Sequence, residues 1–313
     1  EKFPETLLEG ITYIKVKSSR KSYAKICCNF FGNPSKKLKL IGVTGTNGKT
    51  TTVSLCHELM LYMGYKSGLI STNTIKINNK NYKTDLTTPD SYDTNMYLRK
   101  MVELDVNFCF MEVSSHSIHQ ERIDSLEFFI SVFTNITHDH LNYHGDFKTY
   151  LNTKKRLFDN LKNNQKSLVN IDDKNGMYMI QNTVSETYTM SMKKPADFKL
   201  LVIENSFDGM TLKLDNKEIQ TSLIGNFNAY NILSVASIAK LLELNEKNIY
   251  KNLTLLQPPN GRFEIIRNER VTAIVDYAHT PDALLNVLNT INNININKSK
   301  VITVIGCGGG RDK

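Results

Sequence analysis

The sequence is poor in the features that mark secreted, membrane and metal-cluster proteins. Its 313 residues include only five cysteines, and none of them forms a Cys-x-x-Cys pair. This odd number argues against a disulfide framework, and the spacing argues against a zinc ribbon, so we expect reduced thiols and a cytoplasmic protein. No apolar run is long enough to cross a bilayer, and nothing at the start resembles a secretion signal. We therefore expect no membrane insertion.

Arginine and aromatic residues do not alternate anywhere in the chain, so it lacks a stripe on which nucleic-acid bases could stack. The 39 basic and 31 acidic residues give a net charge of +8, which would suit nucleic acid or a polyanionic small molecule. Much of the excess is lysine mixed with asparagine in surface-like stretches such as 78–81. We therefore expect no nucleic-acid partner.

A glycine-rich turn at residues 42–52 is the strongest signal present. An apolar run at 38–43 predicts a buried strand, and a partly apolar helix follows to residue 63. The strict eight-residue P-loop pattern needs glycine at Val43, so the match is to the shortened form Gly-Thr-Asn-Gly-Lys-Thr. We predict that this loop binds ATP through Gly45, Thr46, Asn47, Gly48, Lys49, Thr50 and Thr51.

The residue types in this loop suit a nucleoside triphosphate with magnesium. Glycines let the backbone approach the phosphates, and the helix N-terminus supplies N–H groups that lack a helical partner. Lys49 adds a cation, and the Thr50 hydroxyl is a ligand that Mg²⁺ accepts. The alternative is a glycine turn at an ordinary strand–helix junction.

Strand-like and helical segments alternate along the chain, which predicts an α/β fold with a mostly parallel sheet flanked by helices. Residues 165–223 instead carry short β-type runs with turn signals, and we expect a small antiparallel edge or sheet there. Runs at 271–275, 281–291 and 301–305 predict a further strand–helix–strand unit, the start of a Rossmann-like domain. The remaining predicted segments are helices at 91–104, 147–161 and 226–242 and strands at 106–113 and 128–134.

Glu112 and a histidine-rich segment follow two of the predicted strands. Because active sites in parallel sheets gather at the carboxyl ends of strands, the loops 45–50, 112–122 and 135–145 should meet. Glu112 can hold Mg²⁺ directly or through water. The histidines of 135–145 allow a zinc hydrolase site, a structural loop, or a site in which only His140 serves a second Mg²⁺. The last needs the fewest assumptions.

Taken together, these residues resemble the Mur ligase family, and within it the E-type members. The resemblance runs from about residue 20 to residue 313. The matching motifs are GVTGTNGKTT at 42–51, TTP at 87–89, MEVSSH at 111–116 with Arg122, DHLNYHG at 139–145, Tyr150 with Lys154, GNFN at 225–228 with Asn231, GRFE at 261–264, DYAHTPD at 276–282 and GCGGGRDK at 306–313.

The resemblance implies a set of site residues. The lysine at the position of Lys154 is carbamylated in the family, which turns a cation into an anionic oxygen ligand for Mg²⁺. The implied catalytic residues are Lys49, Glu112, His140 and Lys154, and the implied ligands of two Mg²⁺ ions are Thr50, Glu112, His140 and carbamylated Lys154. The implied muropeptide contacts are Thr87, Thr88, Ser114 and Arg122, and the further ATP contacts are Asn228, Asn231, Arg262, Asp276 and His279.

The implied function is an ATP-dependent amide ligase for peptidoglycan synthesis. It would add diaminopimelate or lysine to UDP-N-acetylmuramoyl-L-alanyl-D-glutamate through an acyl phosphate. The resemblance divides the chain into 1–37, the tail of a UDP-binding domain, 38–268, the central ATP-binding domain, and 269–313, the start of an amino-acid-binding domain. On this division the chain is a fragment, and we expect a monomer.

Several alternatives remain open at this point. Another Mur ligase or a folylpolyglutamate synthetase would share the phosphate loop and the modified lysine. A nucleotide-binding regulator without ligase activity, or a basic P-loop protein that binds nucleic acid, would share the loop alone. Asn142 departs from the family, which usually has Asp there, and so removes a negative charge near the second metal.

Overall fold

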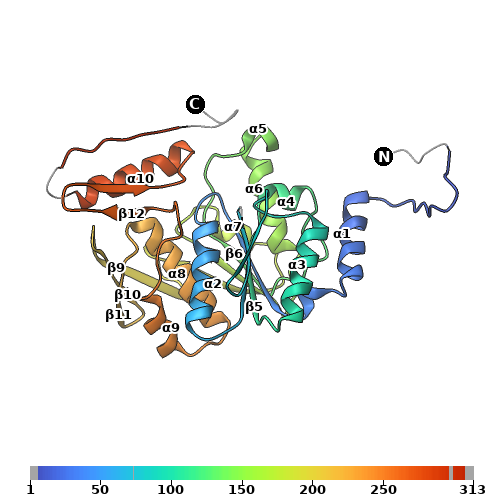
Figure 1. Ribbon diagram of the computed structural model, residues 1–313, viewed down its shortest axis with the longest axis horizontal. Coiled ribbons are helices and arrows are strands. Elements are labelled where there is room, and N and C mark those ends of the chain that lie inside the picture. Colours follow the sequence, from blue (N-terminus) through green and yellow to red (C-terminus); the bar gives the residue numbers. More distant parts are fainter. Residues whose placement is uncertain (1–5, 73, 296–298, 307–313) are drawn as a thin grey trace.

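The computed structural model describes residues 6–72, 74–295 and 299–306. Within these ranges an eleven-stranded sheet crosses the molecule in the order β11-β10-β9-β8-β7-β6-β1-β5-β2-β3-β4 (Figure 1). The strands are β1 (Lys39–Thr44), β2 (Ser67–Ser71), β3 (Thr74–Ile77), β4 (Lys80–Lys83), β5 (Phe108–Glu112), β6 (Ile130–Phe133), β7 (Lys166–Asn170), β8 (Glu186–Ser191), β9 (Phe198–Ser206), β10 (Gly209–Leu214) and β11 (Lys217–Thr221).

Helices cover both faces of the sheet, which confirms the predicted α/β class. The helices are α1 (Ser19–Phe30), α2 (Lys49–Tyr62), α3 (Ser91–Glu103), α4 (Ser115–His119), α5 (Leu141–His144), α6 (Phe147–Asp159), α7 (Gly176–Met179), α8 (Asn226–Leu241), α9 (Glu246–Leu253) and α10 (Pro281–Ile294), with a 3₁₀ turn at Pro34–Lys36. One apolar core joins the sheet to α2, α8 and α9. A second core joins the opposite face to α3, α4, α6 and α7.

The centre of the sheet is parallel because its strands are apolar on both faces. Strand β5 is buried at every position, and β1 is buried from its second residue onward. Strand β1 lies between β5 and β6 and pairs with both in parallel. The chain therefore leaves β1 at a point where the neighbouring connections diverge, which is where ligand sites form in such sheets.

The antiparallel edge is confirmed, but it begins later in the chain than expected. Strands β7 and β8, inside the range 165–223, are parallel members of the main sheet. Only β9, β10 and β11 run antiparallel to one another, and β9 joins β8 directly. Strand β2 and the β3–β4 hairpin, on the other side, had no counterpart in our sequence-based assignment.

The last part of the chain differs from the predicted strand–helix–strand unit. Strands β12 (Glu264–Arg267) and β13 (Thr272–Val275) form an antiparallel hairpin that spans position 268, and α10 follows. The strand predicted at 301–305 is wrong, because these residues pair with no strand and Val304 is 93% exposed. Cys307 and the rest of 307–313 lie outside the described residues. No helix in the described ranges is long and apolar enough to cross a membrane.

Candidate nucleotide and magnesium site

The phosphate loop, residues 45–50, connects β1 to α2 at the centre of the sheet. The predicted meeting of three loops is confirmed. The Asn47 N–H donates to Asn135 Oδ1 at 2.9 Å, and the rings of His116 and His140 lie 4.9 Å apart. Helix α2 begins at Lys49, so its first N–H groups lack helical acceptors and face the end of β1.

Glycine is required in the loop because neighbouring chains approach its backbone closely. A Cβ on Gly45 would lie 2.0 Å from Thr134 Oγ1. Gly48 has a φ of +86°, and a Cβ there would lie 2.7 Å from Asn231 Oδ1. The Thr134 hydroxyl donates to the Asn47 carbonyl at 2.7 Å and so braces the turn from β6. Neither position has room for a side chain, so the loop can keep this path only with glycine at both.

Two lysines converge on one carbonyl of the loop. Lys49 Nζ lies 2.9 Å from Gly45 O and from Thr46 O, and Lys154 Nζ lies 2.9 Å from Gly45 O. Lys154 is 1% exposed and forms no ion pair within the described residues. Burial and the charge of Lys49 hold the pKa of Lys154 well below its usual range, although Asp139 opposes them. Burial also lowers the pKa of Lys49. Burial therefore favours the neutral form of the Lys154 amine.

Glu112 ends β5 beside the loop, as its place in the sequence predicted. Its Oε1 accepts from Ser71 Oγ at 2.5 Å, from the Thr72 N–H at 2.9 Å and from Thr72 Oγ1 at 3.1 Å. All three bonds go to the same oxygen and orient the carboxylate. Sequence reasoning missed Ser71 and Thr72, because β2, which carries them to the site, was not anticipated.

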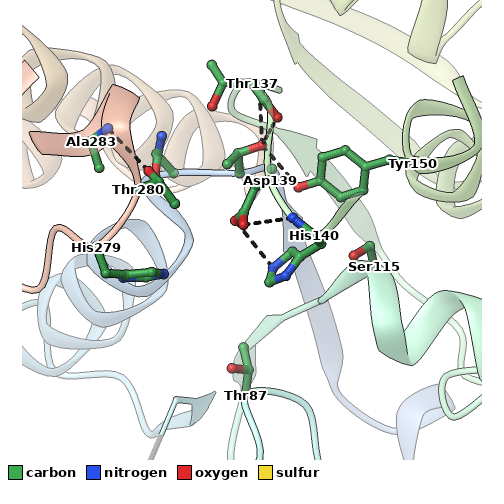
Figure 2. Close-up of polar contacts among 12 residues, drawn as sticks. Thr87, Ser115, Thr137, Asp139, His140, Tyr150, His279, Thr280 and Ala283 are labelled. Carbon is green, nitrogen blue, oxygen red and sulfur yellow. Dashed lines mark hydrogen bonds and ion pairs between the residues drawn. The ribbon is translucent and has the colours of Figure 1, made fainter. Parts of the chain in front are cut away.

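His140 begins α5 in the left-handed region, with φ +54°. Its Nε2 lies 3.3 Å from Asp139 Oδ2, and its N–H donates to Asp139 Oδ1 at 2.8 Å, as Figure 2 shows. Burial lowers the pKa of His140 to about 4, against the opposing charge of Asp139, while His116, Lys49 and Lys154 lower it further. The imidazole is therefore neutral near pH 7 and can act as a metal ligand.

The donor set suits magnesium better than zinc. No group of three or more His, Cys, Asp or Glu side chains in the described ranges is placed to hold a metal ion. A zinc hydrolase site needs three such ligands, so the geometry argues against that alternative. Magnesium keeps several waters and takes one or two carboxylates plus phosphate oxygens. Glu112 can supply one such carboxylate and Thr50 a hydroxyl oxygen; that they and His140 bind Mg²⁺ stays a prediction.

The four residues expected to contact the muropeptide lie together beside Glu112. The Thr88 hydroxyl donates to Glu112 O at 2.8 Å and accepts from the Ser114 N–H at 3.1 Å, so both of its bonding directions are used. Arg122 Nη1 donates to Thr88 O at 2.8 Å, and burial lowers the pKa of this guanidinium. Thr87 Oγ1 lies 3.1 Å from Thr72 Oγ1, the same hydroxyl that contacts Glu112 Oε1. Their contact with a substrate stays a prediction.

The residues expected on the adenine side divide into two groups. Asn231 Nδ2 donates to Asn228 Oδ1 at 3.0 Å on α8, and Asn231 Oδ1 accepts from Thr52 Oγ1 at 3.3 Å on α2. These buried amides join α8 to the helix that follows the phosphate loop. Their contact with ATP stays a prediction.

The second group comes from the β12–β13 region. Arg262 Nη2 donates to Thr50 Oγ1 at 3.1 Å, and its guanidinium lies 4.7 Å from the Tyr277 ring centroid. Asp276 accepts from two backbone N–H groups, and burial raises its pKa. His279 lies across the site from His140 in Figure 2 and meets the Tyr277 ring edge to face, with ring centroids 5.0 Å apart.

One contact to the loop was not predicted. Asn47 Nδ2 donates to Asp282 Oδ2 at 3.1 Å, so the first turn of α10 reaches the phosphate loop. Asp282 falls within the DYAHTPD motif, which was the available signal, but nothing in the motif shows which loop it meets.

The comparisons with known proteins agree with this geometry. Residues 43–239 match the Mur ligase middle domain, and residues 261–313 match the Mur ligase glutamate ligase domain. A curated relative from Bacteroides thetaiotaomicron, named UDP-N-acetylmuramoyl-L-alanyl-D-glutamate–2,6-diaminopimelate ligase, is 50% identical over the whole chain. A relative of the same name from Clostridioides difficile is 38% identical over 98% of the chain.

The chain spans about 65% of the length of these relatives. A solved structure of the same ligase has a TM-score of 0.75 and 29% identity, and the match covers 94% of this chain and 61% of that one. A folylpolyglutamate synthase structure from Thermotoga maritima, at 17% identity and a TM-score of 0.69, shares the fold; that match covers 88% of this chain and 71% of that one. The match over residues 43–239, which includes the phosphate loop, Glu112 and Lys154, shows that the chain belongs to the Mur ligase family.

Proposed function

We propose that this chain forms the ATP-binding part of an E-type Mur ligase. The proposed reaction joins 2,6-diaminopimelate to UDP-N-acetylmuramoyl-L-alanyl-D-glutamate with hydrolysis of ATP to ADP and phosphate. The choice of diaminopimelate over lysine is supported by the names of the relatives at 38–50% identity. We also propose the division into 1–37, 38–268 and 269–313 as parts of three domains.

The observation that carries the proposal is the convergence of Lys49 and Lys154 on Gly45 O. Lys154 is buried and Lys49 is partly buried, and neither forms an ion pair within the described residues. Such cations are costly unless an anion or a chemical change compensates them. A triphosphate bound along the loop would offer Lys49 stronger acceptors than the carbonyls it now contacts. Thr50 and the N–H groups at the start of α2 would complete the cradle.

We propose that Lys154 serves as a carbamate. Its neutral Nζ can attack the carbon of CO₂, so that a new N–C bond forms and one amine proton leaves to solvent. The product is an anion with two oxygens, and its charge would attract the neighbouring Lys49 cation. The two carbamate oxygens and His140 would bind one Mg²⁺ ion, and Thr50 and Glu112 would bind a second.

In the proposed reaction the terminal carboxylate of the muropeptide attacks the γ-phosphate and releases ADP. The amine of diaminopimelate then attacks the acyl phosphate and expels inorganic phosphate. Bound magnesium would neutralise charge on the transferred phosphoryl group. The residues of this chain hold and orient the reactants: Lys49 at the phosphates, Glu112 and His140 at the cations, and Arg122 at an anionic group of the muropeptide.

A chimera tests the proposal. This chain replaces the aligned part of the Bacteroides thetaiotaomicron relative, and ADP release is measured with Mg²⁺, ATP and UDP-N-acetylmuramoyl-alanyl-glutamate. Diaminopimelate and lysine are supplied in turn. We expect release that requires both the muropeptide and diaminopimelate, together with a product heavier by one diaminopimelate residue.

Each other outcome has a definite meaning. Release that depends on lysine would keep the ligase and change its amino acid. ATP binding with no muropeptide-dependent release, in a folded chimera, would contradict the ligase and favour the nucleotide-binding regulator. The unmodified relative, assayed in parallel, shows that the assay detects the reaction.

A further inference from the structure

Helix α6 supports the phosphate loop through two side chains that lie one helical turn apart. Residues four apart on a helix share a face, so Tyr150 and Lys154 point in the same direction. Tyr150 Oη lies 3.0 Å from Thr46 Oγ1, and Lys154 Nζ lies 2.9 Å from Gly45 O. In Figure 2 Tyr150 and His279 lie on opposite sides of Asp139. The helix thus holds two successive residues of the loop.

Tyr150 has no exposed surface, and its ring is enclosed by functional groups. The His144 ring centroid lies 5.2 Å away, the His140 ring 6.1 Å away, and Lys154 Nζ lies 4.7 Å from the centroid of the tyrosine ring. Within the described residues Thr46 is the hydrogen-bond partner of the hydroxyl. A buried hydroxyl that lost this partner would pay its desolvation in full.

The direction of the bond follows from the other contacts of Thr46. Its Oγ1 accepts from the Thr137 N–H at 3.0 Å and can donate its one proton to Thr137 O at 3.3 Å. Tyr150 has no other acceptor in the described chain, so its O–H donates to Thr46 Oγ1. The hydroxyls of Tyr150 and Thr46 are then both satisfied. Its geometry fixes Thr46 between α6 and the loop after β6.

Carbamylation of Lys154 would affect the Lys154–Gly45 contact but not the Tyr150–Thr46 hydrogen bond. A carbamylated Lys154 would keep one N–H and would present two oxygens to a metal, so its contact with Gly45 O changes with its chemical form. The bond from Tyr150 to Thr46 involves neither the amine nor the metal. It can persist in both forms of Lys154.

We propose that Tyr150 is a positioning residue that anchors Thr46 through its hydroxyl and so keeps the phosphate loop in its nucleotide-binding shape whatever the chemical state of Lys154. The inference rests on the proposed function, because the ligand of the loop is taken to be a nucleotide. Tyr150 itself need not touch the nucleotide.

The test is the substitution Tyr150→Phe, which keeps the ring and removes the hydroxyl. Binding of ADP with Mg²⁺ to this chain is measured by titration calorimetry. Loss of one hydrogen bond that orders the loop should raise the Kd about fivefold. The matched control is Tyr250→Phe on α9, whose hydroxyl donates to Asp215 Oδ2 at 2.8 Å and lies outside the loop. The control should leave the Kd within about twofold.

The outcomes separate this inference from the proposed function. If the unsubstituted chain does not bind ADP, the proposed function fails and this inference falls with it. If the unsubstituted chain binds and Tyr150→Phe binds equally well while its Tm falls, Tyr150 is only a packing residue and the inference alone is overturned. An equal loss of affinity in Tyr150→Phe and Tyr250→Phe would also overturn it.

A second variant covers the case in which Tyr150→Phe does not fold. Thr46→Val removes the same hydrogen bond from the loop side while keeping the shape of the side chain. It should weaken ADP binding at least as much as the loss of the tyrosine hydroxyl. A double variant should then be no weaker than Thr46→Val alone, whereas additive losses would contradict a shared bond.

Discussion

The cationic side chains at the two ends of the parallel strands have different partners. We call the side of the sheet where the strands begin the first edge and the side where they end the second edge. At the edge where β6 and β7 begin, a cavity of about 460 Å³ is lined by five cations, Lys21, Lys25, Lys36, Arg156 and Lys162. Four of them, all but Lys25, face a glutamate, for example Lys162 with Glu127 at 2.8 Å. At the edge where the strands end, Lys49 and Lys154 face backbone carbonyls instead.

Four of the five cations at the first edge are paired with glutamates, whereas the lysines at the second edge are not, and this difference has an energetic consequence. Exposed ion pairs at the first edge are already neutralised, and such pairs contribute little to stability. At the second edge Lys154 is buried and forms no ion pair within the described residues, and a buried cation without a counter-charge is costly to keep. Folding alone would favour an apolar residue at Lys154. The proposed function gives a reason for a lysine at this position, namely the proposed reaction of its amine with CO₂.

The largest expected effect comes from Lys154→Ala in the chimera. Loss of the proposed carbamate should reduce kcat on the order of a hundredfold or more, because a metal ligand beside the transferring phosphoryl group is lost. The matched control is Lys155→Ala, since Lys155 is also buried but pairs with Asp159. Lys155→Ala should keep most of the turnover. Equal losses in both variants, at equal folded fraction, would remove the distinction between the two lysines.

The next effect concerns Glu112→Gln. Glutamine keeps an oxygen acceptor for Ser71 and Thr72 but removes the negative charge that would hold Mg²⁺. We expect the Mg²⁺ concentration for half-maximal ADP binding to rise about tenfold, with little change in Tm. Titration calorimetry at several Mg²⁺ concentrations measures this. A magnesium requirement identical to that of the unsubstituted chain would show that Glu112 is structural.

His57 tests the comparison from the first edge. It is a buried titratable group there, and it forms no ion pair with a carboxylate within the described residues. Its Nδ1 lies 3.0 Å from Ser67 Oγ at the start of β2, and burial, with a smaller effect of Lys76, lowers its pKa to about 4. The unfolded chain binds this proton near pH 6.5, whereas the folded chain does not. Stability from this group is therefore complete above about pH 6.5 and falls as the pH drops toward 4.

The variant His57→Gln should reduce the loss of folding stability between about pH 6.5 and pH 4. Urea unfolding at pH 7 and pH 4.5 should show a smaller loss of stability on acidification than in the unsubstituted chain, by on the order of 2 kcal/mol. An unchanged difference between the two pH values would mean that burial at this edge does not hold His57 neutral. In that case the lysines beside the phosphate loop would be the only groups of this comparison whose pKa is lowered by burial without a counter-charge.

The smallest effect is expected from Lys162→Ala at the paired edge. The ion pair with Glu127 is more than half exposed on the lysine side, so its removal should cost no more than about 1 kcal/mol. ADP binding should not change. A larger loss of stability, or any loss of affinity, would show that the first edge is coupled to the second.

The sequence was sufficient for the central elements and for the chemistry of single residues. The apolar run before Gly45 and the glycine–lysine–threonine spacing predicted β1, the loop and α2, because local pattern and local propensity agree there. Glu112 and His140 were assigned to strand ends for the same reason. The parallel β7 and β8 were misassigned, since their pairing depends on neighbours far along the chain. The run at 301–305 looked like a strand but has no pairing partner in the described chain.

By itself, then, the sequence determined the α/β class, the phosphate loop and the family motifs, because these depend on residues close together in the chain. Only the tertiary structure decided which groups share one carbonyl, which carboxylate is held by Ser71 and Thr72, and that Tyr150 supports Thr46. These contacts join residues 40 to more than 100 positions apart. Such pairs meet because the order of strands in the sheet brings their ends together, and no local pattern encodes that order.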